Sequence, residues 1–196
     1  GPPPKEERSI DDSSDPLIDY RTPDFPANPT AEFIELSILP LNPTNETAHK
    51  IGTSSGKPDY AKEALKLKKL GDRGEKIAMD SEIKRLSAAG KKDLASKVER
   101  VSLKSDSLGY DILSFETDGT ERLIEVKATR SKVGSANFFY TANELRTAQE
   151  SDNYFIYMVY DVTSKFPKVW PIKNPFNPEN KDIIKTPINY RVTINA

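Results

Sequence analysis

The spacing of apolar and polar residues divides much of the chain into predicted helices and strands. Apolar positions at helical spacing predict a helix over residues 61–70 that stops at Gly71, and a second helix over residues 72–89 that stops at Gly90. A further helix is predicted over residues 141–150. Period-two alternation or a continuous apolar run predicts strands over residues 97–103, 110–116, 122–128, 154–161, 168–172 and 189–194.

Two of these segments indicate how the elements assemble. Residues 117–120 read Thr-Asp-Gly-Thr, and Asp-Gly suits a primed hairpin turn between the flanking strands. Residues 154–161 are apolar and aromatic throughout, as expected of a strand buried on both faces. The order is then helix, three strands, helix and strand, with an edge strand after it. We therefore expect an α/β fold, in which helices flank a small mixed sheet.

Proline, serine and aspartate dominate the beginning of the chain. Residues 1–30 cannot bury much apolar surface and are typical of a linker or an extended arm. Residues 32–39 alternate and predict a strand, or a segment that docks on the domain. We therefore expect an irregular linker or docking arm over residues 1–58 and a domain over residues 59–196. The first two residues, Gly-Pro, are typical of a removed tag, so we expect a piece of a longer protein.

Composition narrows the class of protein. The 196 residues suffice for one domain with an extension. The absence of cysteine excludes disulfides, thiolate zinc sites and cysteine nucleophiles. No apolar run approaches the roughly 20 residues that cross a bilayer, and no signal peptide is visible. We therefore expect an intracellular protein, cytoplasmic or nuclear, without a membrane partner.

Charge is distributed unevenly along the chain, although the net charge is only −1. Residues 57–104 carry 14 basic and 8 acidic side chains, whereas residues 1–56 carry 4 basic and 10 acidic ones. A basic segment of this kind can hold a polyanion locally. The alternative is that its lysine-rich helices simply present a solvated face.

Two carboxylates and a lysine fall on adjacent predicted strands. Because side chains alternate along a strand, Glu125 and Lys127 point to one side while Val126 points into the core. Asp111 lies on the neighbouring strand, near the end where the sheet could open. Carboxylate oxygens suit Mg²⁺ or Mn²⁺, with the Val126 carbonyl as a further ligand, and a lysine beside them can orient a metal-bound water. The alternative is that Glu125 and Lys127 form a surface ion pair.

Four segments carry a resemblance to known families. They are Gly-Asp-Arg-Gly-Glu at 71–75, Gly-Tyr-Asp-Ile at 109–112, Ile-Glu-Val-Lys-Ala-Thr at 124–129, and the stretch 138–144. An aspartate followed across a hairpin by Glu-Val-Lys resembles the signature of the PD-(D/E)XK nuclease superfamily, whose core is αβββαβ. The four segments together resemble the NO VEIN C-terminal domain family, over roughly residues 70–195. The resemblance implies a restriction-endonuclease-like fold.

The same resemblance implies a function and roles for individual residues. It implies a metal-dependent nuclease, acting on DNA, inside a larger restriction or defence-type protein that includes other domains such as a helicase. Asp111 and Glu125 become implied metal ligands, and Lys127 the implied catalytic lysine. Glu75 resembles an acidic residue aimed at the metal from the first helix, or is a helix-start carboxylate favoured by the helix dipole. Glu144 has a family counterpart, with a helix-start carboxylate as the alternative.

Basic residues near these segments are candidates for phosphate contact: Arg73, Lys91, Lys92, Arg130 and Lys132. Arg130 and Lys132 directly follow the catalytic strand, so they are best placed to meet phosphates near a metal. The loop over residues 131–137, with Gly134 as its pivot, could close over a groove. His49 is the only histidine, so a histidine-based metal site is not expected.

Two other classes of function stay open from the sequence. One is a catalytically inactive nuclease-like module that binds nucleic acid. The other is a protein-interaction module, in which residues 32–39 add as a strand to a partner or to a second copy, giving a homodimer.

Overall fold

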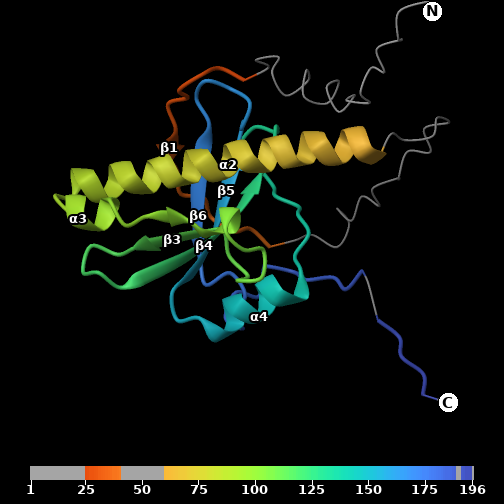
Figure 1. Cartoon of the computed structure of the whole chain (residues 1–196). Coiled ribbons are helices and arrows are strands. Elements are labelled where there is room, and N and C mark those ends of the chain that lie inside the picture. Colours follow the sequence, from red (N-terminus) through yellow and green to blue (C-terminus); the bar gives the residue numbers. More distant parts are fainter. Residues whose placement is uncertain (1–24, 41–59, 189–190, 196) are drawn as a thin grey trace, which may run out of the picture.

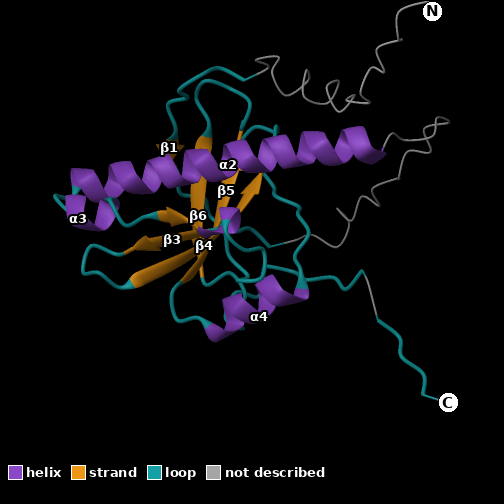
Figure 2. Ribbon diagram, in the orientation of Figure 1, coloured by secondary structure: helices purple, strands orange, loops and turns teal. Residues whose placement is uncertain are grey.

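The computed structural model describes residues 25–40, 60–188 and 191–195 (Figure 1). Six strands form one mixed sheet, with α2 crossing one face and α4 lying against the other (Figures 1 and 2). Across the sheet the strands follow the order β1-β6-β5-β4-β3-β2. Their bounds are β1 Glu32–Phe33, β2 Glu99–Arg100, β3 Ile112–Phe115, β4 Glu121–Ala128, β5 Tyr154–Tyr160 and β6 Lys168–Lys173. The linker predicted for residues 1–30 lies mostly outside the described residues.

The helices are α2 Tyr60–Ala88, α3 Lys92–Ala95 and α4 Ala142–Glu150. The predicted break at Gly71 is wrong, because α2 runs through it. A glycine inside a helix costs only about 1 kcal/mol relative to alanine, and beyond Gly71 helix α2 buries Ile77 and Leu86 in the core. Gly90 does end the helix, at φ 75°. The Lys91 N–H donates to the Leu86 carbonyl over 2.9 Å, as in a Schellman cap.

The central strands and α4 confirm the predicted order. β5 pairs in parallel with β4 and antiparallel with β6, and every residue of β5 is buried. Helix α4 follows the N-cap residue Thr141, whose side chain accepts the Glu144 N–H. From α2 to β5 the chain therefore runs helix, three strands, helix and strand, with α3 and the 3₁₀ helix Val101–Leu103 inserted.

Three local predictions need correction. The strand predicted over residues 97–103 shrinks to β2, because the chain turns into the 3₁₀ helix after Arg100. Residues 191–195 are not in a strand, while residues 189–190 lie outside the described part. The hairpin turn is not primed, because Gly119 alone in it has a positive φ, 92°. Its N–H donates to the Glu116 carbonyl over 3.0 Å, which is typical of a three-residue loop closed by a bulge glycine.

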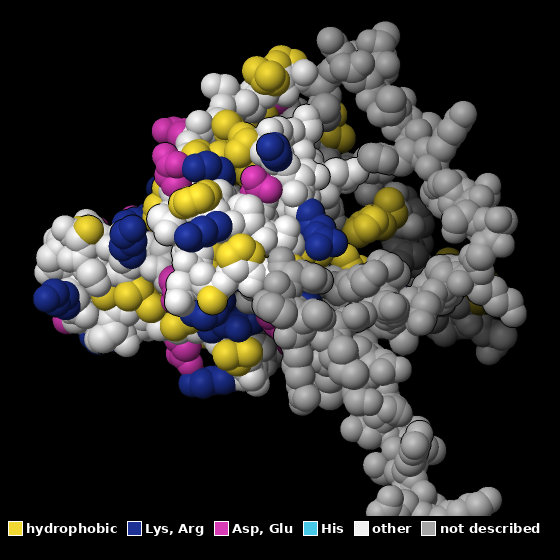
Figure 3. All heavy atoms as spheres, turned by 90° about the horizontal axis from the view of Figure 1, so that it is seen from above, with side chains coloured by type: hydrophobic (Ala, Val, Ile, Leu, Met, Phe, Trp, Pro, Cys, Tyr) yellow, Lys and Arg dark blue, Asp and Glu magenta, His cyan; other side chains and the backbone are white. Residues whose placement is uncertain are grey.

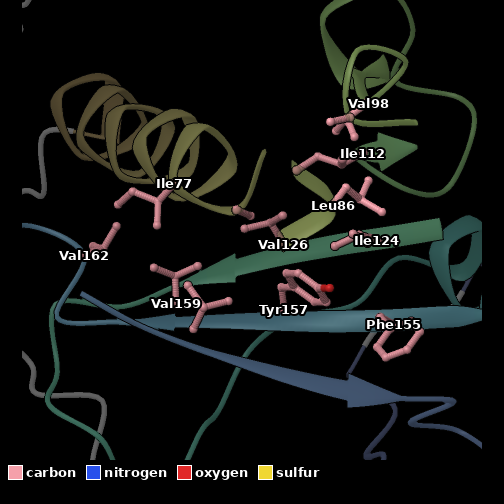
Figure 4. Close-up of a cluster of buried hydrophobic side chains, with 13 residues drawn as sticks. Ile77, Leu86, Val98, Ile112, Ile124, Val126, Phe155, Tyr157, Val159 and Val162 are labelled. Carbon is pink, nitrogen blue, oxygen red and sulfur yellow. The ribbon is translucent and has the colours of Figure 1, made fainter. Parts of the chain in front are cut away.

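Alternation along β4 and β5 separates the two faces of the sheet. The α2 face holds the larger apolar cluster, drawn in Figure 4, to which β4 gives Ile124 and Val126. The α4 face holds a second cluster built on Ala148, Tyr154 and Ile156. The intervening β4 positions therefore point toward α4. Among the described residues, no helix is long and apolar enough to cross a membrane.

A charged network lies within the α2 face, centred on the guanidinium of Arg122. This group donates to both carboxylate oxygens of Glu116 over 2.7 Å and to the Tyr157 hydroxyl over 2.7 Å. It also lies 4.2 Å from the centroid of the Phe155 ring. The fully buried Glu82 is 3.7 Å away and pairs with Arg85 at 2.8 Å. These contacts join α2 to the β3–β4 hairpin.

The outermost strand, β1, comes from the predicted arm. It pairs in parallel with β6, and the N–H groups of Thr30, Glu32 and Ile34 donate to carbonyls of residues 165–169. The segment thus adds a strand to its own sheet, but that strand covers only Glu32–Phe33, so the strand or docking segment predicted over residues 32–39 is confirmed only in its first two residues.

Candidate functional site

The predicted catalytic residues meet on the α4 side of β4. Glu125 and Lys127 point to the same face, and the Lys127 Nζ lies 3.3 Å from a Glu125 carboxylate oxygen. Val126 points the other way, into the core beneath α2. The predicted geometry of the Glu-Val-Lys segment is therefore confirmed. Because the Glu125 side chain is almost fully buried, the pair is not the surface ion pair that the sequence left open.

Asp111 joins this pair at the point where β3 and β4 separate. Regular pairing of the two strands ends at Ile112 and Ile124. Beyond that pair, the Val126 N–H donates to Asp111 Oδ2 over 2.9 Å instead of to a backbone carbonyl. The Asp111 carboxylate thus accepts a β4 N–H group that lies beyond the last residue pair of β3 and β4. This hydrogen bond fixes the carboxylate beside Glu125.

Gly109 lets the chain approach α4 closely before it reaches Asp111. Its φ is 78°, a conformation that favours glycine. A Cβ at this position would overlap the Thr147 side chain and touch the Asn143 carbonyl of α4. The Asn143 amide also donates to the Ser107 carbonyl over 2.8 Å. Helix α4 therefore holds the loop that carries Asp111.

Burial raises the pKa of both carboxyl groups, and the charge of a neighbouring carboxylate adds to each shift. Burial raises the pKa of Asp111 to about 6, opposed by the Val126 N–H and reinforced by the charge of Glu75. Burial, with the charge of Asp111 next, raises the pKa of Glu125 to about 10. Lys127 lowers the pKa of both groups but does not offset these effects. In the absence of a further cation, the pair therefore keeps a proton near neutral pH.

Lys127 is held from three sides. Besides Glu125, its Nζ lies 3.1 Å from a carboxylate oxygen of Glu144 and 4.8 Å from the centroid of the Tyr140 ring. The Tyr140 hydroxyl lies 2.7 Å from that of Tyr154. A carboxylate and an aromatic face both attract an ammonium, so these contacts fix the lysine head.

The two tyrosines also connect Lys127 to the Asp111 loop. The Tyr154 hydroxyl donates to the Gly109 carbonyl over 3.1 Å, so Tyr140 is the donor to Tyr154. Burial raises the pKa of both tyrosines, which keeps their hydroxyls protonated as donors. Sequence reasoning missed Tyr140 and Tyr154 as site residues. Only the position of Tyr140 within the 138–144 motif pointed to it.

Glu75 lies in the middle of α2, because the helix begins at Tyr60. The alternative of a helix-start carboxylate is therefore wrong for this residue. Its carboxylate pairs with Arg100 at 3.0 Å and accepts a hydrogen bond from Ser102. Its charge nevertheless reaches Asp111, whose pKa it raises. Glu144, by contrast, is both a helix-start carboxylate hydrogen-bonded to Thr141 and a direct contact of Lys127.

The predicted phosphate-binding residues fall into three places. Arg130 and Lys132 are exposed just beyond the end of β4, the strand that carries Glu125 and Lys127. Arg73 donates to the carbonyls of Val162 and Ser164 over 2.6 and 3.1 Å, so its guanidinium anchors the loop after β5. The lysines at 91 and 92 lie past the end of α2, about 20 Å along the helix axis from Glu75. In the view from above, basic side chains are scattered among acidic and apolar ones, and do not form one patch (Figure 3).

The candidate metal ligands are still the carboxylates of Asp111 and Glu125 and the Val126 carbonyl. In the described part of the chain, no three acidic or histidine side chains form a ready-made metal site. The chemistry of the two carboxylates does fit a divalent ion. Together with Glu144 they give three carboxylates against one ammonium, a local charge of −2 when all are ionised. Hard oxygen donors with this excess charge suit Mg²⁺ or Mn²⁺.

Glu125→Gln should stabilise the protein in EDTA at pH 8, by about 1–3 kcal/mol in the free energy of unfolding. The folded pKa of Glu125 lies above its ordinary value of 4.5, so its protonation favours folding at low pH. The parent protein loses this contribution to its stability as the pH rises from 4.5 toward 10. The Glu125→Gln variant does not, because glutamine does not titrate. Urea unfolding at pH 4 and pH 8 measures the difference, with the exposed Glu121→Gln on the same strand as the control.

Magnesium should reverse this order of stability. An ion bound by Glu125 stabilises only the native state of the parent protein, and the gain grows with its concentration. Unfolding of the parent and of Glu125→Gln over a Mg²⁺ titration measures this. An equal response of both proteins would show that Glu125 is not a ligand.

The fold and the site together define an α/β domain with an acidic and lysine cluster where two strands of its sheet separate. The family model described as Protein NO VEIN, C-terminal, matches residues 74–172, half of the chain. The chain belongs to this family. The match runs from α2 into β6 and includes Glu75, Asp111, Glu125, Lys127 and Glu144. No curated protein and no solved structure gives a significant match.

Proposed function

We propose that this chain is a metal-dependent nuclease domain that hydrolyses phosphodiester bonds, with DNA as the substrate. One observation carries the proposal: Asp111, just before β3, and Glu125 and Lys127 of β4 converge at a buried point that holds two carboxyl groups beside one lysine. Burying charged groups in this way costs stability, and such clusters are typical of functional sites. The arrangement agrees with the PD-(D/E)XK type that the sequence motifs resemble.

Each of these residues has its own role in the proposed reaction. Asp111 and Glu125 would hold Mg²⁺ or Mn²⁺, with the Val126 carbonyl as a further ligand. When bound, the ion supplies charge stabilisation on a phosphoryl oxygen and acidifies a coordinated water. Lys127, held by Glu144 and Tyr140, orients a water or a phosphate oxygen by donating hydrogen bonds. Arg130 and Lys132 position the backbone phosphates beside the end of β4.

The domain would act as part of a larger restriction or defence-type protein. A single domain whose proposed phosphate contacts beside the site are Arg130 and Lys132 has little surface with which to select a sequence. Target selection would then come from other domains, such as a helicase. The alternative function is a catalytically inactive nuclease-like module, which binds nucleic acid or a protein partner without metal.

Incubation with supercoiled plasmid and with single-stranded DNA tests the proposal. We expect cutting with Mg²⁺ or Mn²⁺ and none with EDTA, because the carboxylate pair needs a cation to face a phosphate. Product ends and rates are read by gel electrophoresis over a metal titration. Salt-sensitive DNA binding that EDTA leaves unchanged, with no cutting under any metal, would instead favour the binding module.

A further inference from the structure

Three consecutive aromatic residues precede α4, and they have different surroundings. Phe138 and Tyr140 point inward, with ring centroids 6.1 Å apart, and both pack on the α4-face cluster. Because side chains alternate along an extended segment, the residue between them points outward. Phe139 is 78% exposed, and no other phenylalanine in the described part of the chain is as exposed.

The loop that presents Phe139 is fixed at several points. Near its start, the Ser131 carbonyl accepts the Asp161 N–H over 2.8 Å. The Gly134 carbonyl accepts the Tyr160 hydroxyl over 2.6 Å, so the residue predicted as a pivot is tied to the end of β5. At the other end, Tyr140 is held by Tyr154. The ring of Phe139 is therefore presented by a backbone that is anchored on both sides.

The position of Phe139 relates it to the candidate site. The next residue, Tyr140, lies with its ring under the Lys127 Nζ at 4.8 Å. The exposed Arg130 and Lys132 stand at the other end of the same loop. The loop residues 131–137 are small or polar apart from Val133, so this loop does not supply the apolar core that protein interfaces need. An exposed ring on a loop that also carries exposed basic side chains suits a ligand that has flat apolar faces and negative charge.

We propose that Phe139 is a stacking platform for an unpaired base, and that the substrate of this site is single-stranded nucleic acid or a single-stranded stretch. In a duplex the base faces are covered by neighbouring bases, so a side chain can stack only on a base outside the duplex. Arg130 and Lys132 would pair with the adjoining phosphates. The inference rests on the proposed function for the position of the cut, but base stacking itself needs no catalysis.

Equilibrium binding in EDTA tests the inference without cleavage. The probes are a labelled single-stranded DNA of twelve nucleotides and a duplex of the same sequence, followed by fluorescence anisotropy. Phe139→Ala should weaken single-strand binding about 5- to 100-fold, the range that loss of one stacked base produces. Phe139→Trp should retain it. The control is Phe166→Ala, which removes a phenylalanine that is 59% exposed on the β5–β6 loop.

The outcomes separate this inference from the proposed function. An unchanged single-strand affinity in Phe139→Ala, or an equal loss for the duplex, overturns stacking. Loss of self-association in Phe139→Ala without loss of DNA binding also overturns it, in favour of a second copy as the occupant. If Phe139 supports single-strand binding but no metal allows cutting, the inference stands and the nuclease proposal fails. If Lys127→Ala abolishes cutting while Phe139→Ala binds single strands normally, the nuclease proposal stands and the stacking inference fails.

Discussion

Lys127→Ala should lower the rate of metal-dependent DNA cleavage by at least about 100-fold, the usual cost of removing a group that acts in the transition state. The reason lies in its surroundings. Two carboxylates and an aromatic ring hold the ammonium at one point beside Glu125. Single-turnover cleavage of single-stranded DNA at saturating Mg²⁺ measures the loss. Lys84→Ala, which removes an exposed lysine of α2, should cut at the parental rate.

The metal response of the variant separates a catalytic role from a structural one. The proposed ligands are carboxylates and a carbonyl, so Lys127→Ala should still be stabilised by Mg²⁺ against unfolding. Asp111→Ala should lose both cleavage and this stabilisation. Cutting by Lys127→Ala at the parental rate would show that the proposed mechanism is wrong. Loss of cutting together with a lower unfolding temperature and no metal response would point to a damaged fold.

Arg122→Leu should lower the free energy of unfolding by about 3–5 kcal/mol, the usual cost of breaking a buried ion pair from one side. The substitution leaves the Tyr157 hydroxyl and the Glu116 carboxylate without their shared donor, and it removes a partner of the fully buried Glu82. It also removes the guanidinium that lies over the Phe155 ring. Urea unfolding at pH 7 in EDTA measures the change.

A surface pair provides the matched control for this network. Lys76 and Asp80 lie 2.8 Å apart but are 72% and 61% exposed, so Lys76→Ala should cost about 0.5 kcal/mol or less. Arg122→Lys keeps the charge but not the planar fork, and should lose an intermediate amount. Because the network lies on the face opposite Lys127, Arg122→Lys should retain cleavage when folded. A loss below about 1 kcal/mol in Arg122→Leu would mean that water or rearrangement replaces the guanidinium.

Local sequence rules predicted much of the site. The period of two on β4 placed Glu125 and Lys127 together, because alternation is set by the backbone alone. The helix-start residue Thr141 and the apolar run of β5 fixed the elements around them. The prediction that Asp111 lies beside Glu125 depended on the pairing of two strands across a hairpin. The Asp-Gly dipeptide indicated this hairpin, although the predicted turn type was wrong.

The remaining features depend on contacts that no local pattern records. Gly71 is an ordinary helix breaker in sequence, yet the apolar residues that follow it keep α2 continuous. That continuity moves Glu75 from a helix start to a helix middle. Tyr140 and Tyr154 belong to different elements, and their link to Gly109 exists only once α4 is packed. Roles that rest on long-range contacts were therefore the ones missed.

The pairing of β1 with β6 has a practical consequence for anyone who dissects this protein. The family match starts at residue 74. A polypeptide that begins at residue 74, or at residue 59, would lack β1 and leave the edge of β6 unpaired. The carbonyls of Lys165, Pro167 and Val169 would then lose their hydrogen-bond donors. An unpaired sheet edge favours aggregation by strand pairing between molecules. A soluble minimal unit for expression should therefore begin before Thr30, well outside the segment that sequence comparison marks.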